Sequence, residues 1–181
     1  MAAHAGRYEL AGRITLRTSR DGLAAQAGHD LTIDVGRWSG ELVMGEDLAP
    51  VSLDVRVDLA SLIVRTGTGG IKPLTERDRR EIIATARKVL SVDRYPEATF
   101  TADSFSPADD GGTIAGTLAL SGQNGPLRLQ VHQTGPDRYR AKTAVRQTSF
   151  GIKPYSGFLG ALKVSDQVDV EAEVDLTPTS G

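Results

Sequence analysis

An alternation of apolar and polar residues with a period of two restricts the fold of this chain more than any other feature. Successive side chains of a β-strand point to opposite faces, so such a pattern is typical of a strand with one buried side. The alternation is clearest in VSLDVRVDL and VSDQVDVEAEVDL, whose apolar members are Val51, Leu53, Val55, Val57 and Leu59, and Val168, Val170, Ala172, Val174 and Leu176. The chain is therefore predicted to be mainly β.

The same reasoning predicts about eight strands in all. GTLALSGQNGPLRLQV indicates a hairpin, with Asn124-Gly125 as its tight turn because both residues tolerate a positive φ. Further strands are predicted near 8–17, 29–44, 97–105 and 138–149, with Gly36 and Gly40 bending the second of them. Phe100 and Phe105 fall on opposite faces of an unbroken strand.

One segment has helical periodicity instead. TERDRREIIATARKVL begins with a suitable N-cap at Thr75, carries acids in its first turn, and groups its apolar residues on one side. We predict one amphipathic helix over 75–90 that packs on the sheet or covers a barrel end.

These elements predict a single domain over residues 1–181 that folds as a closed eight-stranded antiparallel β-barrel with one α-helix between strands. We favour a closed barrel over the alternative, a two-sheet sandwich, because closing the sheet removes exposed strand edges. A barrel of eight strands can hold one small ligand.

Composition narrows the function. Lys and Arg number 21 and Asp and Glu 23, and the two signs are mixed along the chain, which argues against nucleic acid or an anionic membrane as the main partner. A transient membrane contact and a homodimer are left open. The N-terminus does not resemble a secretory signal and no segment is apolar enough to span a bilayer, so we expect a soluble, cytoplasmic protein.

His29 and Asp30 are adjacent, but they do not form a catalytic pair if they lie on a regular strand, because neighbouring side chains point to opposite faces. His29 then shares the interior face with Leu31, Ile33 and Val35. It either contacts a ligand or ends the strand with a hydrogen bond to a nearby carbonyl.

The remaining chemistry is sparse. The three histidines are scattered, cysteine is absent, and phosphate-loop and nucleophile-elbow motifs are missing, so we expect no catalytic site, no metal and no cofactor other than a bound lipid. A hydrolase or isomerase would require His29 together with an acid from another strand.

FGIKPYSGFLG, residues 150–160, gathers three aromatic residues, three glycines and Lys153. This segment either plugs one end of the core with Phe150, Tyr155 and Phe158, or forms a mouth flap with one cation for an acidic head group.

Several segments, in this order, resemble the elements of the YceI-like family: ERDRREI, SVDRYPEATFTADSF, GTLALSGQNGPLRLQV, TSFGIKP and VSDQVDVEAEVDL, with GHDLTIDVGRWSGEL upstream. The similarity covers about residues 8–176. The best matches are Arg77, Asp78, Tyr95, Pro96, Phe100, Gly116, Leu118, Gly122, Phe150, Gly151, Ile152, Val164, Asp166, Val168 and Val170.

The resemblance implies a lipocalin-like barrel whose apolar interior, in polyisoprenoid-binding members, holds the chain of a quinone or a prenyl diphosphate. The sequence departs from the family where many members carry an Arg three residues before Phe150, because Gln147 stands there and Arg146 is displaced by one. The helix is also more charged than expected, and the periplasmic leader of many members is missing.

We therefore expect a non-enzymatic carrier for a polyisoprenoid or another long-chain lipid. The alternative is a stress-response or interaction module whose barrel is filled by its own side chains. The candidate ligand-binding residues are His29, Leu31, Ile33, Val35, Trp38, Leu53, Val55, Val57, Phe100, Leu118, Leu129, Phe150, Lys153, Tyr155 and Phe158, with His29, Lys153 and Tyr155 as the polar contacts.

Overall fold

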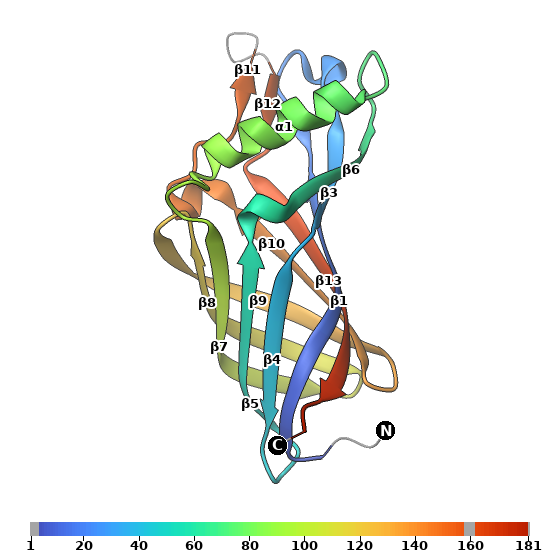
Figure 1. Cartoon of the computed structure of the whole chain (residues 1–181), viewed down its shortest axis with the longest axis vertical. Coiled ribbons are helices and arrows are strands. Elements are labelled where there is room, and N and C mark those ends of the chain that lie inside the picture. Colours follow the sequence, from blue (N-terminus) through green and yellow to red (C-terminus); the bar gives the residue numbers. More distant parts are fainter. Residues whose placement is uncertain (1–3, 158–161, 181) are drawn as a thin grey trace.

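Antiparallel strands close into a barrel in the computed structural model, which describes residues 4–157 and 162–180 (Figure 1). The strands of the barrel are β1 (Gly6–Thr18), β3 (Asp30–Val35), β4 (Trp38–Met44), β5 (Pro50–Asp58), β6 (Leu62–Thr68), β7 (Glu97–Ala108), β8 (Gly111–Leu120), β9 (Gln123–Gly135), β10 (Arg138–Arg146) and β13 (Gln167–Pro178). A small separate sheet contains β2 (Arg20–Asp21), β11 (Ser156–Gly157) and β12 (Leu162–Val164).

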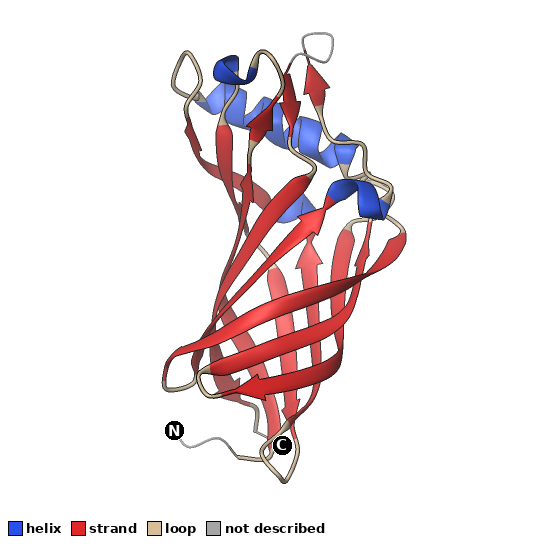
Figure 2. Cartoon of the chain, turned by 180° about the vertical axis from the view of Figure 1, so that it is seen from behind, coloured by secondary structure: helices blue, strands red, loops and turns tan. Residues whose placement is uncertain are grey.

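The ring runs β13-β10-β9-β8-β7-β5-β4-β1, and the pairing of β13 with β1 closes it. Figure 2 shows the closed wall from behind. The predicted eight-stranded barrel is confirmed, and the two-sheet sandwich is wrong.

Two of the eight strands are interrupted. β3 and β4 pair with the same edge of β1, through Leu16 with Ile33 and Leu10 with Gly40, so together they form the bent strand predicted over 29–44. The break falls at Gly36 and the next residue, whereas Gly40 lies within β4. β5 and β6 form a second interrupted strand, separated by the 3-10 helix η2 (Leu59–Ser61).

The helix α1 (Glu76–Val89) crosses one end of the barrel, and both termini lie at the other end (Figure 1). It begins at Thr75, as predicted, because the Thr75 hydroxyl accepts from the Asp78 backbone while the Asp78 carboxylate accepts from the Thr75 backbone. Arg79 Nη1 donates to the carbonyl oxygen of Val64 at 2.9 Å. The helix thereby covers β6 at a place where an open strand edge would otherwise remain.

The predicted hairpin forms, but its turn is not at Asn124-Gly125. The turn residues are Ser121 and Gly122, with φ of 51° and 78°, and Gly125 pairs with Leu118 inside the ladder. The Tyr95 ring packs against Gly122, where a Cβ would lie 2.6 Å from it. Ser-Gly thus occupies the left-handed turn that was expected for Asn-Gly.

Two β-bulges change which side chains face inward. In β7 the register shifts between Ala102 and Ser104, and both Phe100 and Phe105 consequently line the interior. The second bulge lies in β5, where Val51 is the extra residue opposite the Val43–Met44 step of β4. The Val51 side chain is 61% exposed. The expectation that Val51 shares the buried face of Leu53 is wrong for this reason.

Two clusters of buried side chains pack beneath the helix. One cluster groups Leu59, Val92, Ala98, Leu118, Phe150 and Ile152, and a second groups Ile14, Ile33, Val35, Leu62 and Val64. Ile82, Ile83 and Leu90 of the helix segment pack on the second cluster, and Val89 and Leu90 on the first. The helix therefore anchors one end of the barrel.

Candidate functional site

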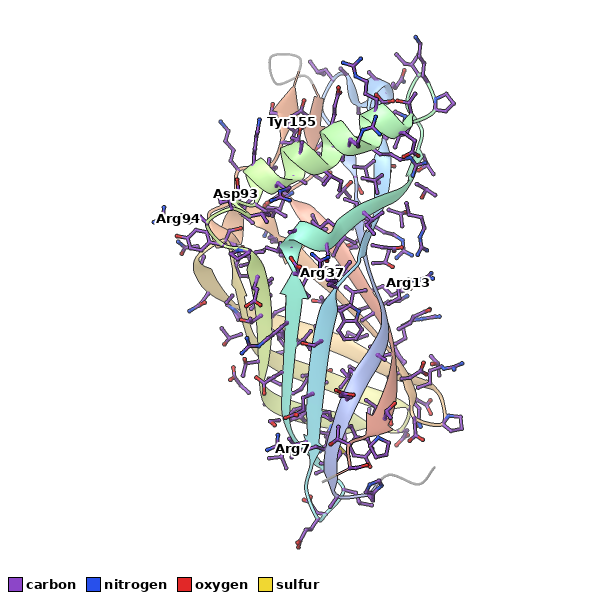
Figure 3. All side chains as sticks on the ribbon, in the orientation of Figure 1. Arg7, Arg13, Arg37, Asp93, Arg94 and Tyr155 are labelled. Carbon is purple, nitrogen blue, oxygen red and sulfur yellow. The ribbon has the colours of Figure 1, made fainter. Side chains whose placement is uncertain are left out.

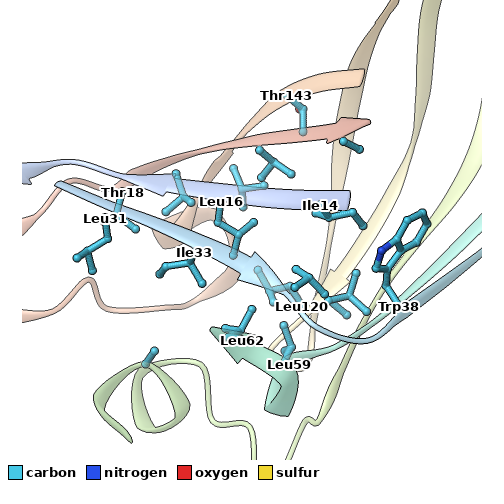
Figure 4. Close-up of a pocket in the computed structure, with 18 of the residues that line it drawn as sticks. Ile14, Leu16, Thr18, Leu31, Ile33, Trp38, Leu59, Leu62, Leu120 and Thr143 are labelled. Carbon is cyan, nitrogen blue, oxygen red and sulfur yellow. The ribbon is translucent and has the colours of Figure 1, made fainter. Parts of the chain in front are cut away.

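A cavity of about 1060 Å³ occupies the barrel interior. Its wall takes apolar side chains from every strand of the ring, and Figure 4 shows part of this lining from β1, β3 and their neighbours. The apolar faces of β1, β5, β9 and β13 contribute Ile14, Leu16, Leu53, Val55, Val57, Leu127, Leu129, Val131, Val168, Val170, Ala172, Val174 and Leu176.

Many of these inward side chains keep accessible surface. Leu31, Val55, Leu129 and Val170 point into the barrel, yet each is only half-buried, whereas Val92 in the packed cluster is 1% exposed. Side chains in a filled core touch neighbours on all sides and lose nearly all of their accessible surface. The interior is therefore hollow and not filled by its own side chains.

Most of the candidate residues from the sequence line this cavity. They are His29, Leu31, Ile33, Val35, Trp38, Leu53, Val55, Val57, Phe100, Leu118, Leu129 and Tyr155. Their contact with a ligand stays a prediction, since a wall position shows access to the cavity and no more.

Of the other three candidates, two lie elsewhere. Phe150 is 3% exposed and packs in the first cluster, against Gly125, where a Cβ would be 3.0 Å from its ring. Lys153 is exposed and does not belong to the cavity wall formed by the described residues. Phe158 lies outside the described residues. Of the residue 150–160 segment, Tyr155 reaches the cavity and Phe150 acts as a core plug.

The sequence missed several wall residues. Ile82 and Ala86 of α1 face the cavity, so the helix is both a lid and part of the lining. Gln147 is 8% exposed, belongs to the wall, and donates from Nε2 to the Ser165 carbonyl, while the neighbouring Arg146 points outward near Asp166. Strand alternation accounts for this, because residues one position apart point to opposite faces.

The cavity reaches the surface at the helix end. Among its wall residues Ile71, Lys72, Pro73 and Lys163 are exposed, and Tyr155 is 44% exposed beside the helix (Figure 3). These residues come from the β6–α1 loop and the small sheet of β2, β11 and β12. We define them as the mouth of the cavity.

His29 lies at this mouth, just before β3. Its Nε2 is 2.7 Å from the Lys72 carbonyl oxygen, the hydrogen bond expected of a histidine that ends a strand. Asp30 points away and accepts from the Arg20 backbone amide at 2.9 Å. The two adjacent side chains do not interact as a catalytic pair, in agreement with the strand argument.

The opposite end of the interior also carries polar groups. Tyr8 is 3% exposed, and its hydroxyl donates to the His4 carbonyl at 2.8 Å. Tyr139 also lines the cavity here, and burial raises the pKa of its phenol, with the charge of Asp137 adding to the effect. Two tyrosines thus place hydroxyl groups at the far end of an otherwise apolar tunnel.

Residues 4–157 and 162–180 contain no group of three or more His, Asp or Glu side chains that could hold a metal ion. Within the same ranges, no helix is both long enough and apolar enough to cross a membrane.

Comparison with known proteins gives consistent results. A protein-family model described as the YceI-like domain matches residues 14–176. The UPF0312 protein YE1254 of Yersinia enterocolitica is 26% identical over 108 residues, which are 58% of this chain and 47% of that protein. This match therefore spans about half the length of the relative.

Two solved structures share the fold. BcnA of Burkholderia cenocepacia superposes with a TM-score of 0.60 at 14% identity, covering 92% of this chain and 96% of that one. A YCEI protein of Campylobacter jejuni gives a TM-score of 0.60 at 17% identity, covering 82% and 85%. With the family model covering nearly the whole barrel, these matches show that the chain belongs to the YceI-like domain family.

Proposed function

We propose that this protein binds a long apolar lipid, a polyisoprenoid of the quinone or prenyl diphosphate type, inside the barrel and carries or sequesters it. The observation that carries this proposal is the hollow interior: about 1060 Å³ lined by half-buried aliphatic side chains. This volume is at the upper end for ligand sites and equals that of about 35 water molecules.

The energetics favour a long chain over a short one. Burial of each CH₂ group stabilises by about 0.8 kcal/mol, so one five-carbon prenyl unit contributes roughly 4 kcal/mol. Association costs at least about 4 kcal/mol in lost freedom. The first unit only offsets this cost, and further units should raise the affinity until the cavity is filled.

The polar groups at the two ends suggest how such a chain is oriented. Arg20, Lys72 and Lys163 belong to the wall at the mouth, where a charged or carbonyl-bearing head group could stay near water. The hydroxyls of Tyr8 and Tyr139 lie at the far end, where the carboxylate of Asp137 also lines the cavity and disfavours an anionic head group. We propose that the head group lies at the mouth.

The two other hypotheses fit the structure less well. A module with a filled barrel would leave no cavity of this size. A hydrolase or isomerase would need an acid positioned on His29, but Asp78, an acid of the cavity wall on the helix, is occupied by the N-cap of α1.

Trp38 provides the experiment, because it is the only tryptophan and it lines the cavity. Lipids extracted from the natively purified protein would be identified by mass spectrometry, and prenyl quinones of increasing chain length would be titrated into delipidated protein. We expect saturable quenching of Trp38 fluorescence that tightens with chain length. Absence of a co-purified lipid together with no quenching would refute the proposal.

A further inference from the structure

The two ends of the barrel differ in charge, although the sequence mixes charges evenly. The segments at the helix end, residues 19–30, 69–96, 151–157 and 162–165, contain ten Lys and Arg and six Asp and Glu. The turns at the other end, residues 45–49, 109–110 and 136–137, contain five acidic residues and no Lys or Arg. Folding therefore creates a basic end and an acidic end that the order of residues does not reveal.

Several cations at the basic end are not neutralised by close acids. In the described part of the chain, Lys72, Arg80, Lys88, Lys153 and Lys163 make no ion pair within 4.0 Å. Other cations at this end do, as Arg77 with Glu81 at 3.0 Å. The unpaired cations lie on the helix, on the β6–α1 loop and around the small sheet.

Two apolar side chains project from the same end. Leu23, between β2 and the 3-10 helix η1 (Ala25–Ala27), is 100% exposed, and Ile71 in the β6–α1 loop is 78% exposed. The two loops contact each other, because Gly69 lies against the Arg20 guanidinium and Gly70 against the His29 ring. Figure 1 shows both loops at the tip of the molecule beside the helix.

From these observations we infer that the helix end docks on an anionic lipid bilayer, with Leu23 and Ile71 entering the headgroup region and the unpaired cations facing the lipid charges. A bilayer fits better than a protein groove, since fully exposed apolar tips surrounded by cations are the pattern of interfacial membrane contacts. The acidic end would be repelled, which fixes the orientation.

This inference rests on the proposed function. It also supplies a route by which the lipid passes from the bilayer into the barrel. Ile71, Lys72 and Lys163 belong both to the mouth of the cavity and to the docking surface. A lipid that leaves the bilayer at this point enters the barrel without crossing water. Two apolar tips by themselves give only weak, reversible binding, so we expect the contact to be transient.

Vesicle cosedimentation tests the inference, with phosphatidylcholine vesicles and with vesicles that also contain phosphatidylglycerol. Leu23→Glu combined with Ile71→Glu should weaken binding to the anionic vesicles at least tenfold. The matched control is Leu48→Glu combined with Val51→Glu, because these residues are 50% and 61% exposed at the acidic end. The control should change binding less than about twofold, and salt should weaken the binding of the unsubstituted protein.

Uptake of a prenyl quinone added from ethanol, without vesicles, separates the two proposals. The single variant Leu23→Glu is used here, because Leu23 does not belong to the cavity wall. Its binding to anionic vesicles should fall severalfold, and retained Trp38 quenching shows that it is folded and binds lipid. If the unsubstituted protein takes up quinone but ignores anionic vesicles, or if both variant pairs lose vesicle binding equally, the docking inference is overturned while lipid binding stands. If quenching is absent in every protein, the proposed function itself fails.

Discussion

Substitution of Ala172 by Phe distinguishes a hollow barrel from a filled one by the sign of its effect on stability. Ala172 lies on β13 opposite Ile14 and Ala141, lines the cavity, and is half-buried although it faces the interior. A benzyl group there would project into empty space. In a filled core the same group would collide with its neighbours.

The expected magnitude follows from the buried area. A buried Phe removes about 150–250 Å² from water, and the part beyond Ala accounts for roughly half of this. At about 25 cal/mol per Å², burial of this area stabilises the folded state by about 2 kcal/mol. The side-chain entropy lost when the ring is ordered offsets about 1 kcal/mol of this. Ala172→Phe should therefore stabilise the ligand-free protein by about 1 kcal/mol and raise Tm by about 2–4 °C.

Val92→Phe is the matched control, because Val92 is 1% exposed, packs in the first cluster and does not line the cavity. Overpacking there should cost about 1–3 kcal/mol. Urea unfolding of the delipidated proteins, followed by circular dichroism, measures both changes. The reasoning is refuted if Ala172→Phe destabilises as much as Val92→Phe. A second consequence is that Ala172→Phe should weaken prenyl quinone binding, because it shortens the tunnel.

Three further predictions follow from local structure. Thr75→Ala removes the N-cap of α1 and should lower the free energy of unfolding by about 1 kcal/mol in a urea titration. Gly116→Ala should lower the free energy of unfolding by more than about 2 kcal/mol, because the new Cβ would lie 2.2 Å from a β7 carbonyl oxygen. Gly135→Ala is the control, because its Cβ would lie 3.7 Å from the nearest atom, and thermal denaturation should show almost no change. Hydrogen bonds from the hydroxyl and backbone amide of Thr148 lower the pKa of Asp166, so its stabilisation is present above its ordinary pKa of about 3.9 and is lost as pH falls through the lower folded value. The stability difference between the unsubstituted protein and Asp166→Asn should thus be full near neutral pH and shrink below about pH 4; a difference independent of pH would contradict this assignment.

Much of the barrel could be predicted because each strand has one buried face. In β13, five alternating apolar residues all line the cavity, from Val168 to Leu176, and the N-cap at Thr75 was readable from its side chain and the acids that follow. These features depend on local patterns that a single sequence contains. The closed ring then follows from the need to leave no open edge.

The hairpin turn could not be located from the same pattern. Turns at Ser121-Gly122 and at Asn124-Gly125 both keep Leu118 and Leu129 on the same face, so the alternation does not distinguish the two registers. Tertiary contacts do: Tyr95 packs on Gly122, and Phe150 packs on Gly125. These partners come from distant parts of the chain.

The bulges explain the errors in side-chain direction. One extra residue in β7 turns Phe105 to the same side as Phe100. An extra residue in β5, opposite β4, exposes Val51. Nothing in the local alternation marks these positions. The placement of Phe150 in the core, away from the cavity, was equally hidden because a plug and a flap require the same aromatic residues.

A crystal structure of the natively purified protein tests the central claim most directly. The account predicts an elongated, continuous density in the barrel, in contact with Ile33, Leu53 and Leu129 and with its polar end towards Lys72 and Lys163. A barrel whose side chains have collapsed into the cavity, or one filled by a hydrogen-bonded chain of ordered waters in lipid-loaded crystals, would contradict it.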